Sequence, residues 1–513
     1  MGTPKTIPQL LEARAKQAPS KRFLYFKEKE ISYSQLDEIA NRIANGLIEL
    51  GVQPGQKVCV LMTNCAEYVY CFFGISKSGA VTTPINSLLK GEEITYIINN
   101  SDAKALIAQS KFEETIDKIL PKCPKLETVI IADKDGASER RVGLNRLLAA
   151  PASRPPVEVT EENIAGIIYT SGTTGHPKGV ELTHKNYLVD SGQVVAAARM
   201  TEADRFLCIL PLFHVNAQVV TTLSPMYAGA SMILLEGFSP KTFLPALAKY
   251  RATAFSGVPT VYAILNSLPD AEKYDLSALR FCVCGAAPMP VEVFNAFESK
   301  YKAFILEGYG LSEATCASSI NPLDGKRKIG SIGLPLEGQE MKILDDNGKE
   351  LPAGQVGEIV VRGEVVMKSY YKNPEATAEA LKGGWLHTGD LGCVDEDGYF
   401  YIVGRKKEMI IRGGENIYPK EAEEVLYRHP AIMEAAVVGV PDKIWGEEVM
   451  AFIILNEDAE LTADEVIAYC KEHLADFKCP RKVEFVKAFP KTATGKIQKN
   501  KIVEGYLEKR KQP

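Results

Sequence analysis

Short apolar runs alternate with amphipathic segments over the first two-thirds of the chain. KVCVLM (57–62), TVIIA (128–132) and FCVCG (281–285) are typical of buried strands. Between such runs, residues 32–51 place Leu36, Ile39, Ile43, Leu47 and Leu50 on one face of a predicted helix, and Gly51 follows as its end signal. Apolar strands separated by helices predict a parallel, doubly wound α/β sheet.

The pattern changes near residue 340. Residues 341–373 contain short β-rich runs separated by Asp-Asn-Gly and Pro-Ala-Gly, which predict hairpins. Two helices follow: one opens at Pro419, and the other starts with Thr462 and Glu465 at capping-box spacing. We therefore expect a large N-terminal domain (1–404) with doubly wound mixed sheets and a β-rich subdomain. A small, mobile α+β C-terminal domain (405–513) is expected to follow it.

One span, 206–235, contains no Asp, Glu, Lys or Arg and is long enough to cross a bilayer. It also contains Pro211, His214, Asn216, Pro225 and Gly229, which would be costly in lipid. A buried strand, turn and helix beside a pocket is the better interpretation, and no transmembrane segment is expected.

Composition and charge restrict the class of protein. The 513 residues are 46% hydrophobic and 24% charged, which is typical of a globular protein of two or more domains. A formal net charge of −5 does not favour binding to nucleic acid or to anionic membranes. The eleven cysteines form no Cys-x-x-Cys motif, and a reducing cytoplasm is the expected location.

Residues 167–179, IIYTSGTTGHPKG, combine glycines, hydroxyls and a lysine. Glycines allow backbone N–H groups to approach phosphate oxygens, hydroxyls donate to the same oxygens, and Lys178 adds positive charge. The loop is not a Walker A motif, because Gly179 follows the lysine where Ser or Thr would be required. A phosphate-binding loop is the favoured interpretation, and a flexible surface turn is the alternative.

The run YTSGTTGHPKGVELTH (169–184) resembles the signature loop of the adenylate-forming superfamily. Five further motifs follow in the order expected of that superfamily: GAAPMP, EGYGLSEAT, GWLHTGDLG, GRKKEMIIRGGENIYP and PKTATGKI, which begin at 285, 307, 384, 404 and 490. The superfamily comprises acyl- and aryl-CoA ligases, nonribosomal adenylation domains and luciferases, and the chain looks most like bacterial fatty-acid CoA ligases. The resemblance implies that a carboxylate attacks the α-phosphorus of ATP, and that the thiol of CoA then displaces AMP. It also implies Mg²⁺.

The resemblance assigns most of the nucleotide site. Matching positions for ATP and its phosphates are Thr170, Ser171, Gly172, Thr173, Thr174, Lys178, Gly285, Ala286, Ala287, Glu307, Gly308, Tyr309, Ser312, Asp390 and Arg405. Among these, Tyr309 is expected to stack on adenine and Asp390 to accept the ribose hydroxyls. Glu313, with Thr174, is the expected Mg²⁺ contact.

Lys496 is the expected catalytic lysine for adenylation, which it would support by bridging the carboxylate and the α-phosphate. Because it is remote in sequence from the phosphate loop, the resemblance implies rotation of the C-terminal domain about a hinge at Lys407. The second orientation would bring Gly413, Gly414 and Glu415 to the pantetheine arm of CoA. From the residues alone, a surface lysine in a basic tail is the leading interpretation of Lys496.

His214 is expected beside the carboxylate pocket, although a lone histidine among apolar residues is often a satisfied core group. The other expected pocket walls are Val215, Asn216, Gln218, Val258, Ser318 and Ser319. Valines suit an aliphatic chain, whereas Asn216 and Gln218 would suit polar groups. The absence of Lys and Arg from span 206–235 disfavours dicarboxylic acids.

The sequence thus predicts an AMP-forming acyl-CoA ligase for a medium- or long-chain fatty acid. An aryl- or small-acid (carnitine-type) CoA ligase, or a free-standing adenylation enzyme that loads a carrier protein, remains the alternative. The expected partners are the acid, ATP and CoA, with no nucleic acid; a homodimer is left open.

Overall fold

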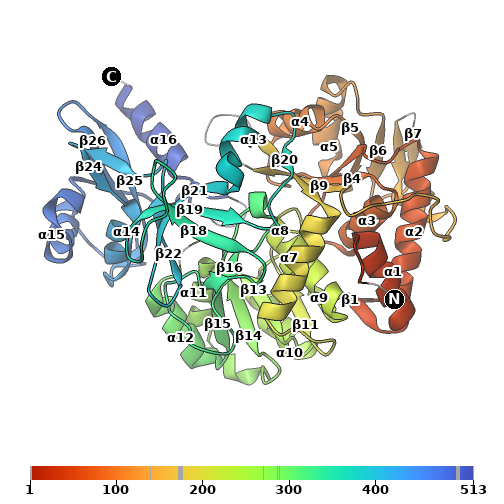
Figure 1. Ribbon diagram of the computed structural model, residues 1–513, viewed down its shortest axis with the longest axis horizontal. Coiled ribbons are helices and arrows are strands. Elements are labelled where there is room, and N and C mark those ends of the chain that lie inside the picture. Colours follow the sequence, from red (N-terminus) through yellow and green to blue (C-terminus); the bar gives the residue numbers. More distant parts are fainter. Residues whose placement is uncertain are drawn as a thin grey trace.

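Four sheets organise the protein, whose computed structural model describes residues 3–138, 140–170, 177–269, 271–285, 287, 289–492 and 497–511. Two large mixed sheets and a small antiparallel sheet form the N-terminal part, and the fourth sheet belongs to the C-terminal part. Figure 1 shows the C-terminal elements in blue, gathered at one end of the molecule beside β18, β19, β21 and β22.

The first large sheet has nine strands among the described residues, in the order β17-β16-β15-β14-β13-β11-β12-β1-β2. Its strands are β1 (Arg22–Phe26), β2 (Lys29–Ser32), β11 (Arg205–Cys208), β12 (Ser231–Leu234), β13 (Ala254–Gly257), β14 (Phe281–Cys284), β15 (Phe304–Tyr309), β16 (Ser319–Ile320) and β17 (Leu334–Pro335). The pairings from β1 to β15 through β12, β11, β13 and β14 are parallel. The central strands are buried along their whole length, which explains why their sequences are continuous apolar runs.

The second large sheet, also of nine described strands, has the order β20-β10-β9-β4-β3-β5-β6-β8-β7. Its strands are β3 (Lys57–Leu61), β4 (Val81–Pro84), β5 (Ala103–Ala108), β6 (Thr128–Ile131), β7 (Ala137–Ser138), β8 (Arg141–Gly143), β9 (Ile164–Thr170), β10 (Lys178–Thr183) and β20 (Ser369–Tyr370). β9, β10 and β20 pair antiparallel at one edge. At this edge, β10, which begins at Lys178, therefore lies beside β20, a segment almost two hundred residues further along the chain.

Helices pack on and between these two sheets (Figure 1). They are α1 (Ile7–Gln17), α2 (Tyr33–Glu49), α3 (Ala66–Lys77), α4 (Gly91–Asn100), α5 (Glu113–Ile119), α6 (Leu144–Leu148), α7 (His184–Ala197), α10 (Pro240–Lys249), α11 (Pro259–Ser267), α12 (Val291–Tyr301) and α13 (Pro374–Ala380). The predicted helix from residue 32 is α2, which begins with a Ser32–Gln35 capping box and is followed by Gly51 at φ +83°. Leu36, Ile43 and Leu47 are fully buried, as the apolar face predicts.

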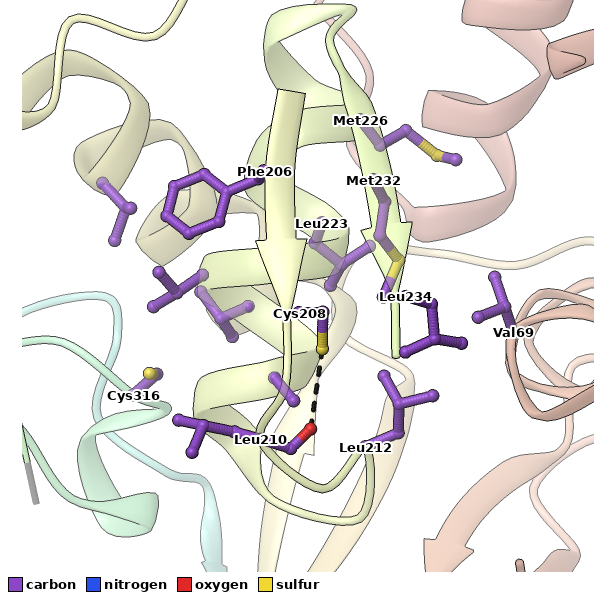
Figure 2. Packing of buried hydrophobic residues seen from close by; sticks show 14 of the residues in the cluster. Val69, Phe206, Cys208, Leu210, Leu212, Leu223, Met226, Met232, Leu234 and Cys316 are labelled. Atoms are coloured by element: carbon purple, nitrogen blue, oxygen red, sulfur yellow. Dashed lines mark hydrogen bonds between the residues drawn. The ribbon is translucent and has the colours of Figure 1, made fainter. Parts of the chain in front are cut away.

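The uncharged span folds into core structure. It forms β11, then α8 (Val215–Gln218), a π-helical turn (Val219–Leu223), α9 (Ser224–Ala228) and β12. Figure 2 shows Cys208 of β11 and Met232 of β12 packed with Leu223 of the π-helical turn. The Cys208 thiol donates a hydrogen bond to the Leu210 carbonyl at 3.5 Å. No helix in the described part of the chain has the length and apolar character that crossing a bilayer requires.

The β-rich segment after residue 340 forms an antiparallel sheet in the order β18-β19-β21-β22. Its strands are β18 (Glu340–Leu344), β19 (Gly357–Arg362), β21 (Leu386–Val394) and β22 (Phe400–Arg405). The predicted hairpins are therefore present. β21 pairs with β22 so that Asp390 lies opposite Arg405.

The C-terminal part has its own sheet and its own cores. It contains β23 (Ile410–Arg412), β24 (Glu415–Ile417), β25 (Ile432–Asp442), β26 (Gly446–Leu455), β27 (Lys482–Phe485), α14 (Pro419–Tyr427), α15 (Ala463–His473) and α16 (Lys499–Lys511). α15 begins with the predicted Thr462–Glu465 capping box. The core of the large domain extends to Phe400 and Ile402, whereas that of the small domain starts at Ile410, so the two cores lie on either side of the expected hinge at Lys407.

Candidate active site

The ends of the glycine-rich loop are held by a strand pair. Thr170 closes β9, Lys178 opens β10, and the two residues are partners in the antiparallel register. The Thr170 hydroxyl also donates to the Lys178 carbonyl at 3.5 Å. Ser171, Gly172, Thr173 and Thr174 lie outside the described residues, so their predicted phosphate contacts stay predictions.

Lys178 and Glu313 both contact one aromatic side chain, that of Tyr370. The ammonium of Lys178 is 5.0 Å from the ring centre of Tyr370, and the Tyr370 hydroxyl donates to Glu313 Oε1 at 2.9 Å. Glu313 is in the 3₁₀ turn Ser312–Ala314, which directly follows β15 and Gly310. Three segments distant in sequence thus meet: β10, this turn and β20. Tyr370 is not among the residues predicted from the sequence, although the tyrosine pair Tyr370–Tyr371 shortly before Asn373-Pro374 was a signal that could have pointed to it.

The next group of predicted residues lies at the carboxyl ends of the parallel strands β13, β14 and β15. Gly285 follows β14 and donates its N–H to Gly257 of β13 at 3.4 Å. A Cβ on Gly285 would lie 3.4 Å from the Gly308 carbonyl of β15, so the backbones approach closely here. Ala287 is described and half-buried, whereas Ala286 is outside the described part. Ligands of open α/β sheets bind at such strand ends.

Tyr309, Asp390 and Arg405 form a connected group. The Tyr309 hydroxyl donates to Asp390 Oδ2 at 2.7 Å, and Arg405 Nε lies 2.9 Å from Asp390 Oδ1. Asp390 is buried. Burial of the Tyr309 hydroxyl, together with the nearby carboxylate of Asp390, raises the pKa of Tyr309 well above the ordinary range. The predicted adenine and ribose residues therefore touch one another, a contact that the motif positions did not reveal.

Glu307 is buried just before Gly308 and Tyr309. Its Oε2 accepts the Gly330 N–H at 2.9 Å. Burial raises its pKa to about 7, although the Gly330 amide and the charges of Lys420 and Arg327 act in the opposite direction. Lys420 belongs to α14 and donates to the Ile402 carbonyl of β22 at 2.7 Å. A cation of the small domain therefore lies close enough to affect the charge of Glu307.

His214 immediately precedes α8, and its ring centre lies 4.6 Å from that of Phe213. Burial lowers the pKa of His214 to about 4, so the imidazole is neutral at pH 7. His214 Nε2, Asn216 Oδ1 and Ser318 Oγ are buried and have no hydrogen-bond partner among the described residues. Buried polar atoms without partners are uncommon, and a ligand is one explanation for them.

The remaining predicted pocket residues differ in their contacts. Val215 is half-buried at the start of α8, and Val258 is buried directly before α11. The Ser319 hydroxyl donates to the Ile332 carbonyl at 2.7 Å. Gln218 accepts from the Tyr187 hydroxyl at 2.9 Å and donates to the Leu212 carbonyl at 3.0 Å, so both polar atoms of its amide are engaged within the protein. We therefore do not carry Gln218 forward as a residue that recognises the acid.

The small domain carries the other predicted groups. Gly413 and Gly414 have φ values of +59° and +90° in the tight turn between β23 and β24, and Glu415 opens β24. Gly413 donates its N–H to the Trp445 carbonyl at 2.9 Å, and a Cβ here would lie 2.7 Å from the Trp445 ring. Lys407 is exposed in the turn after β22.

Lys496 lies beyond the described residues, but the base of its loop is described. Lys491 and Ile497 form an antiparallel bridge, and Gln498 donates its N–H to the Pro490 carbonyl at 2.8 Å. The described residues on the two sides of positions 493–496 are thus joined to each other.

Comparisons with known proteins agree with this arrangement. The family model described as AMP-binding enzyme matches residues 11–371, and that described as AMP-binding enzyme C-terminal domain matches residues 421–496. A long-chain-fatty-acid–CoA ligase of Bacillus subtilis (strain 168) is 36% identical over 98% of this chain and 95% of its own. A sulfoacetate–CoA ligase of Cupriavidus necator is 36% identical over 97% of both chains. The crystal structure of the anthranilate CoA ligase AuaEII in complex with anthranoyl-AMP superposes with a TM-score of 0.93, at 34% identity over 99% of both chains.

The chain therefore belongs to the AMP-binding enzyme family, within the adenylate-forming superfamily. It is an AMP-forming acid–CoA ligase that works through an acyl-adenylate. The predicted superfamily, enzyme class and α/β fold are confirmed. The named relatives act on a long-chain fatty acid, sulfoacetate and anthranilate, three different classes of acid.

Proposed function

We propose that this ligase activates a medium- or long-chain fatty acid. The observation that carries the proposal is the composition of the span that contains His214, which has 30 residues and no charged side chain. The Phe213 side chain, whose ring lies beside that of His214, is buried, and so is the predicted pocket residue Val258. An acid with a second charged group would find no cation in this span to pair with that charge, at a cost of several kcal/mol by order of magnitude.

In the first step, an oxygen of the fatty-acid carboxylate forms a bond to the α-phosphorus of ATP, and pyrophosphate leaves. Thr170 and Lys178, with the loop between them, would hold the β- and γ-phosphates. Ser312 would donate to a phosphate oxygen, Tyr309 would bind adenine, and Asp390 with Arg405 would bind the ribose. Lys496 would stabilise the charge that develops as the new oxygen–phosphorus bond forms.

A magnesium ion suits this site. Glu313 Oε1 is held by Tyr370, and Oε2 has no hydrogen-bond or ion-pair partner among the described residues. No group of three or more His, Cys, Asp or Glu side chains within the described ranges would hold a metal alone. Mg²⁺ typically binds through one or two carboxylates plus substrate phosphates, and it would neutralise phosphate charge here.

In the second step, the CoA thiolate attacks the acyl carbon and AMP leaves with the electrons of the acyl–oxygen bond. Rotation about Lys407 would replace Lys496 by Gly413, Gly414 and Glu415, which would line the path of the pantetheine arm. His214 would stand beside the acyl group in both steps.

An aryl acid is the second candidate. Asn216 Oδ1 and Ser318 Oγ are buried without partners in the described structure and would suit an amino or hydroxyl substituent. The similarity to the anthranilate CoA ligase supports the same candidate.

A panel of acids assayed for AMP release with CoA separates these functions. We expect the highest kcat/KM with a straight-chain acid longer than six carbons. Higher kcat/KM with anthranilate or a hydroxycinnamate would replace this proposal by the aryl candidate. Thioester formation only with an added carrier protein, and not with CoA, would contradict both.

A further inference from the structure

We propose that Tyr370 is a positioning residue that keeps Lys178 and Glu313 apart and presents the Glu313 carboxylate to the metal–nucleotide complex. The inference deepens the proposed function and rests on it, because it takes Lys178 as a phosphate ligand and Glu313 as a metal ligand. It assigns a role to a side chain that none of the six motifs includes.

Tyr370 contacts two groups of opposite charge. Its hydroxyl donates to Glu313 Oε1 at 2.9 Å, and its ring centre lies 5.0 Å from the Lys178 ammonium. A direct ion pair between Lys178 and Glu313 would occupy both groups and remove them from the ligand. Because the Tyr370 ring attracts the ammonium and its hydroxyl holds the carboxylate, each charged group has a contact other than the opposite charge.

The backbone fixes Tyr370 in this place. Val180 pairs with Tyr370 in the β10–β20 register, and the Tyr371 N–H donates to the Gly179 carbonyl at 2.7 Å. The Tyr370 N–H itself donates to the Thr377 hydroxyl at 2.9 Å. Tyr370 therefore moves with the strand that carries Lys178.

Glu313 is attached to the same segment. The Met367 N–H donates to the Glu313 carbonyl at 2.8 Å, and the Thr315 hydroxyl donates to the Val365 carbonyl at 2.6 Å. Residues 365–370 thus hold the segment around Glu313 by one main-chain contact, one contact from a side chain to the main chain and one contact between side chains. Burial and the Glu313 carboxylate raise the pKa of Tyr370 above its ordinary range, so the phenol remains a hydrogen-bond donor at neutral pH.

The chain supplies a matched control in the next residue. The Tyr371 hydroxyl donates to Asp102 Oδ2 at 3.2 Å, and the ammonium of Lys57 lies 4.7 Å from the Tyr371 ring centre. Tyr371 therefore makes the same two kinds of contact as Tyr370, with residues that belong to none of the predicted sites. Loss of its hydroxyl reports the general cost of such a substitution.

The test measures binding without turnover. Electron paramagnetic resonance would follow Mn²⁺ binding to the full-length protein with α,β-methylene-ATP, an analogue in which the α,β bridge cannot be broken. Tyr370→Phe should weaken Mn²⁺ binding about tenfold, as expected for the loss of one hydrogen bond to a charged group. Tyr371→Phe should leave it unchanged, and Glu313→Gln should weaken it at least as much as Tyr370→Phe.

A second measurement separates the hydroxyl from the ring. In EDTA, analogue affinity measured by calorimetry should be unchanged in Tyr370→Phe, because the ring still holds Lys178 away from Glu313. It should fall several-fold in Tyr370→Leu, where the two charges can pair.

Wild-type-like Mn²⁺ binding by Tyr370→Phe, or an equal loss in Tyr371→Phe, would overturn the inference and leave the proposed function standing. Failure of the wild-type protein to bind Mn²⁺ with the analogue would overturn both. Thermal unfolding of each variant confirms that the comparison is between folded proteins.

Discussion

Buried polar side chains in this enzyme differ in whether the protein itself satisfies them. His184 Nδ1 accepts the Ile7 N–H at 3.3 Å, which ties α1 to α7. Asp390 is engaged by both Tyr309 and Arg405. His214 Nε2 and Asn216 Oδ1, in contrast, are buried without partners in the described structure. The His184 contact maintains the fold, whereas the two atoms without partners belong to residues that are proposed to line the acid site.

The burial of His184 leads us to expect that the protein becomes less stable as the pH is lowered. Burial lowers its pKa from 6.5 to about 3, so the unfolded chain takes up a proton below pH 6.5 that the folded protein does not. The free energy of unfolding therefore falls as pH decreases from about 6.5 towards 3. When the pH is lowered from 7.5 to 5.5, the free energy of unfolding should fall by about 1.4 kcal/mol more in the wild-type protein than in His184→Asn. The asparagine does not titrate, and its side-chain oxygen can still accept the Ile7 N–H.

Urea denaturation of both proteins at the two pH values measures this difference. Equal losses of unfolding free energy in the two proteins would show that His184 is not held neutral by burial.

The nucleotide segment depends on one glycine between a strand and a turn. β15 ends at Tyr309, and the 3₁₀ turn with Glu313 starts at Ser312. A Cβ on Gly310 would lie 1.5 Å from the Cys316 carbonyl oxygen, which is a backbone atom. Because a side chain there would force the backbone to move, Gly310 lets Tyr309 and Glu313 project from adjacent positions on a tightly folded segment.

Gly310→Ala should therefore abolish nucleotide binding and lower the melting temperature by several degrees, in line with a backbone clash of a few kcal/mol. The matched control is Gly237→Ala, since a Cβ at Gly237 would meet no heavy atom within 4 Å. Thermal unfolding and calorimetric titration with ATP provide the two measurements. Retained ATP affinity in Gly310→Ala would contradict the close contact.

The small domain contacts the sheet that carries the expected ribose residues. Lys420 of α14 donates to the Ile402 carbonyl of β22, the strand that ends at Arg405, and Arg405 pairs with Asp390 within the sheet. Figure 1 shows α14 beside β22, at the junction of the small domain with the antiparallel sheet. Rotation of the small domain would therefore change the Lys420 contact with β22.

If the small domain rotates between the two steps, substitution of Lys496 should impair adenylation but not thioester formation. Lys496→Ala should reduce acid-dependent ATP–pyrophosphate exchange by about 10²–10³, the effect typical of losing one transition-state donor. The same variant should convert supplied acyl-adenylate and CoA into thioester at a rate close to that of the wild type, because Lys496 would then be away from the acyl group. Equal loss of both activities would contradict rotation.

Much of the fold was predictable from local pattern. The apolar runs, the helix from residue 32, the hairpins after residue 340 and the Thr462–Glu465 capping box all correspond to elements of the structure. Such features depend on residues within a few positions of one another, so a single sequence carries them. The contacts of Gln218 and the partners of Asp390 were not predictable in this way, since Tyr187, Leu212 and Tyr309 reach these residues only through packing.

By itself, the sequence determined the superfamily, the reaction class and the identity of the nucleotide motifs, because glycines, hydroxyls and charges at close spacing are a local property of the chain. Only the tertiary structure decided which residues meet. It brought Tyr370 into contact with both Lys178 and Glu313, and it engaged Gln218 within the core while Asn216 kept a buried oxygen without a partner in the described structure. Strand order and helix packing set these contacts, and they bring together positions separated by many tens of residues.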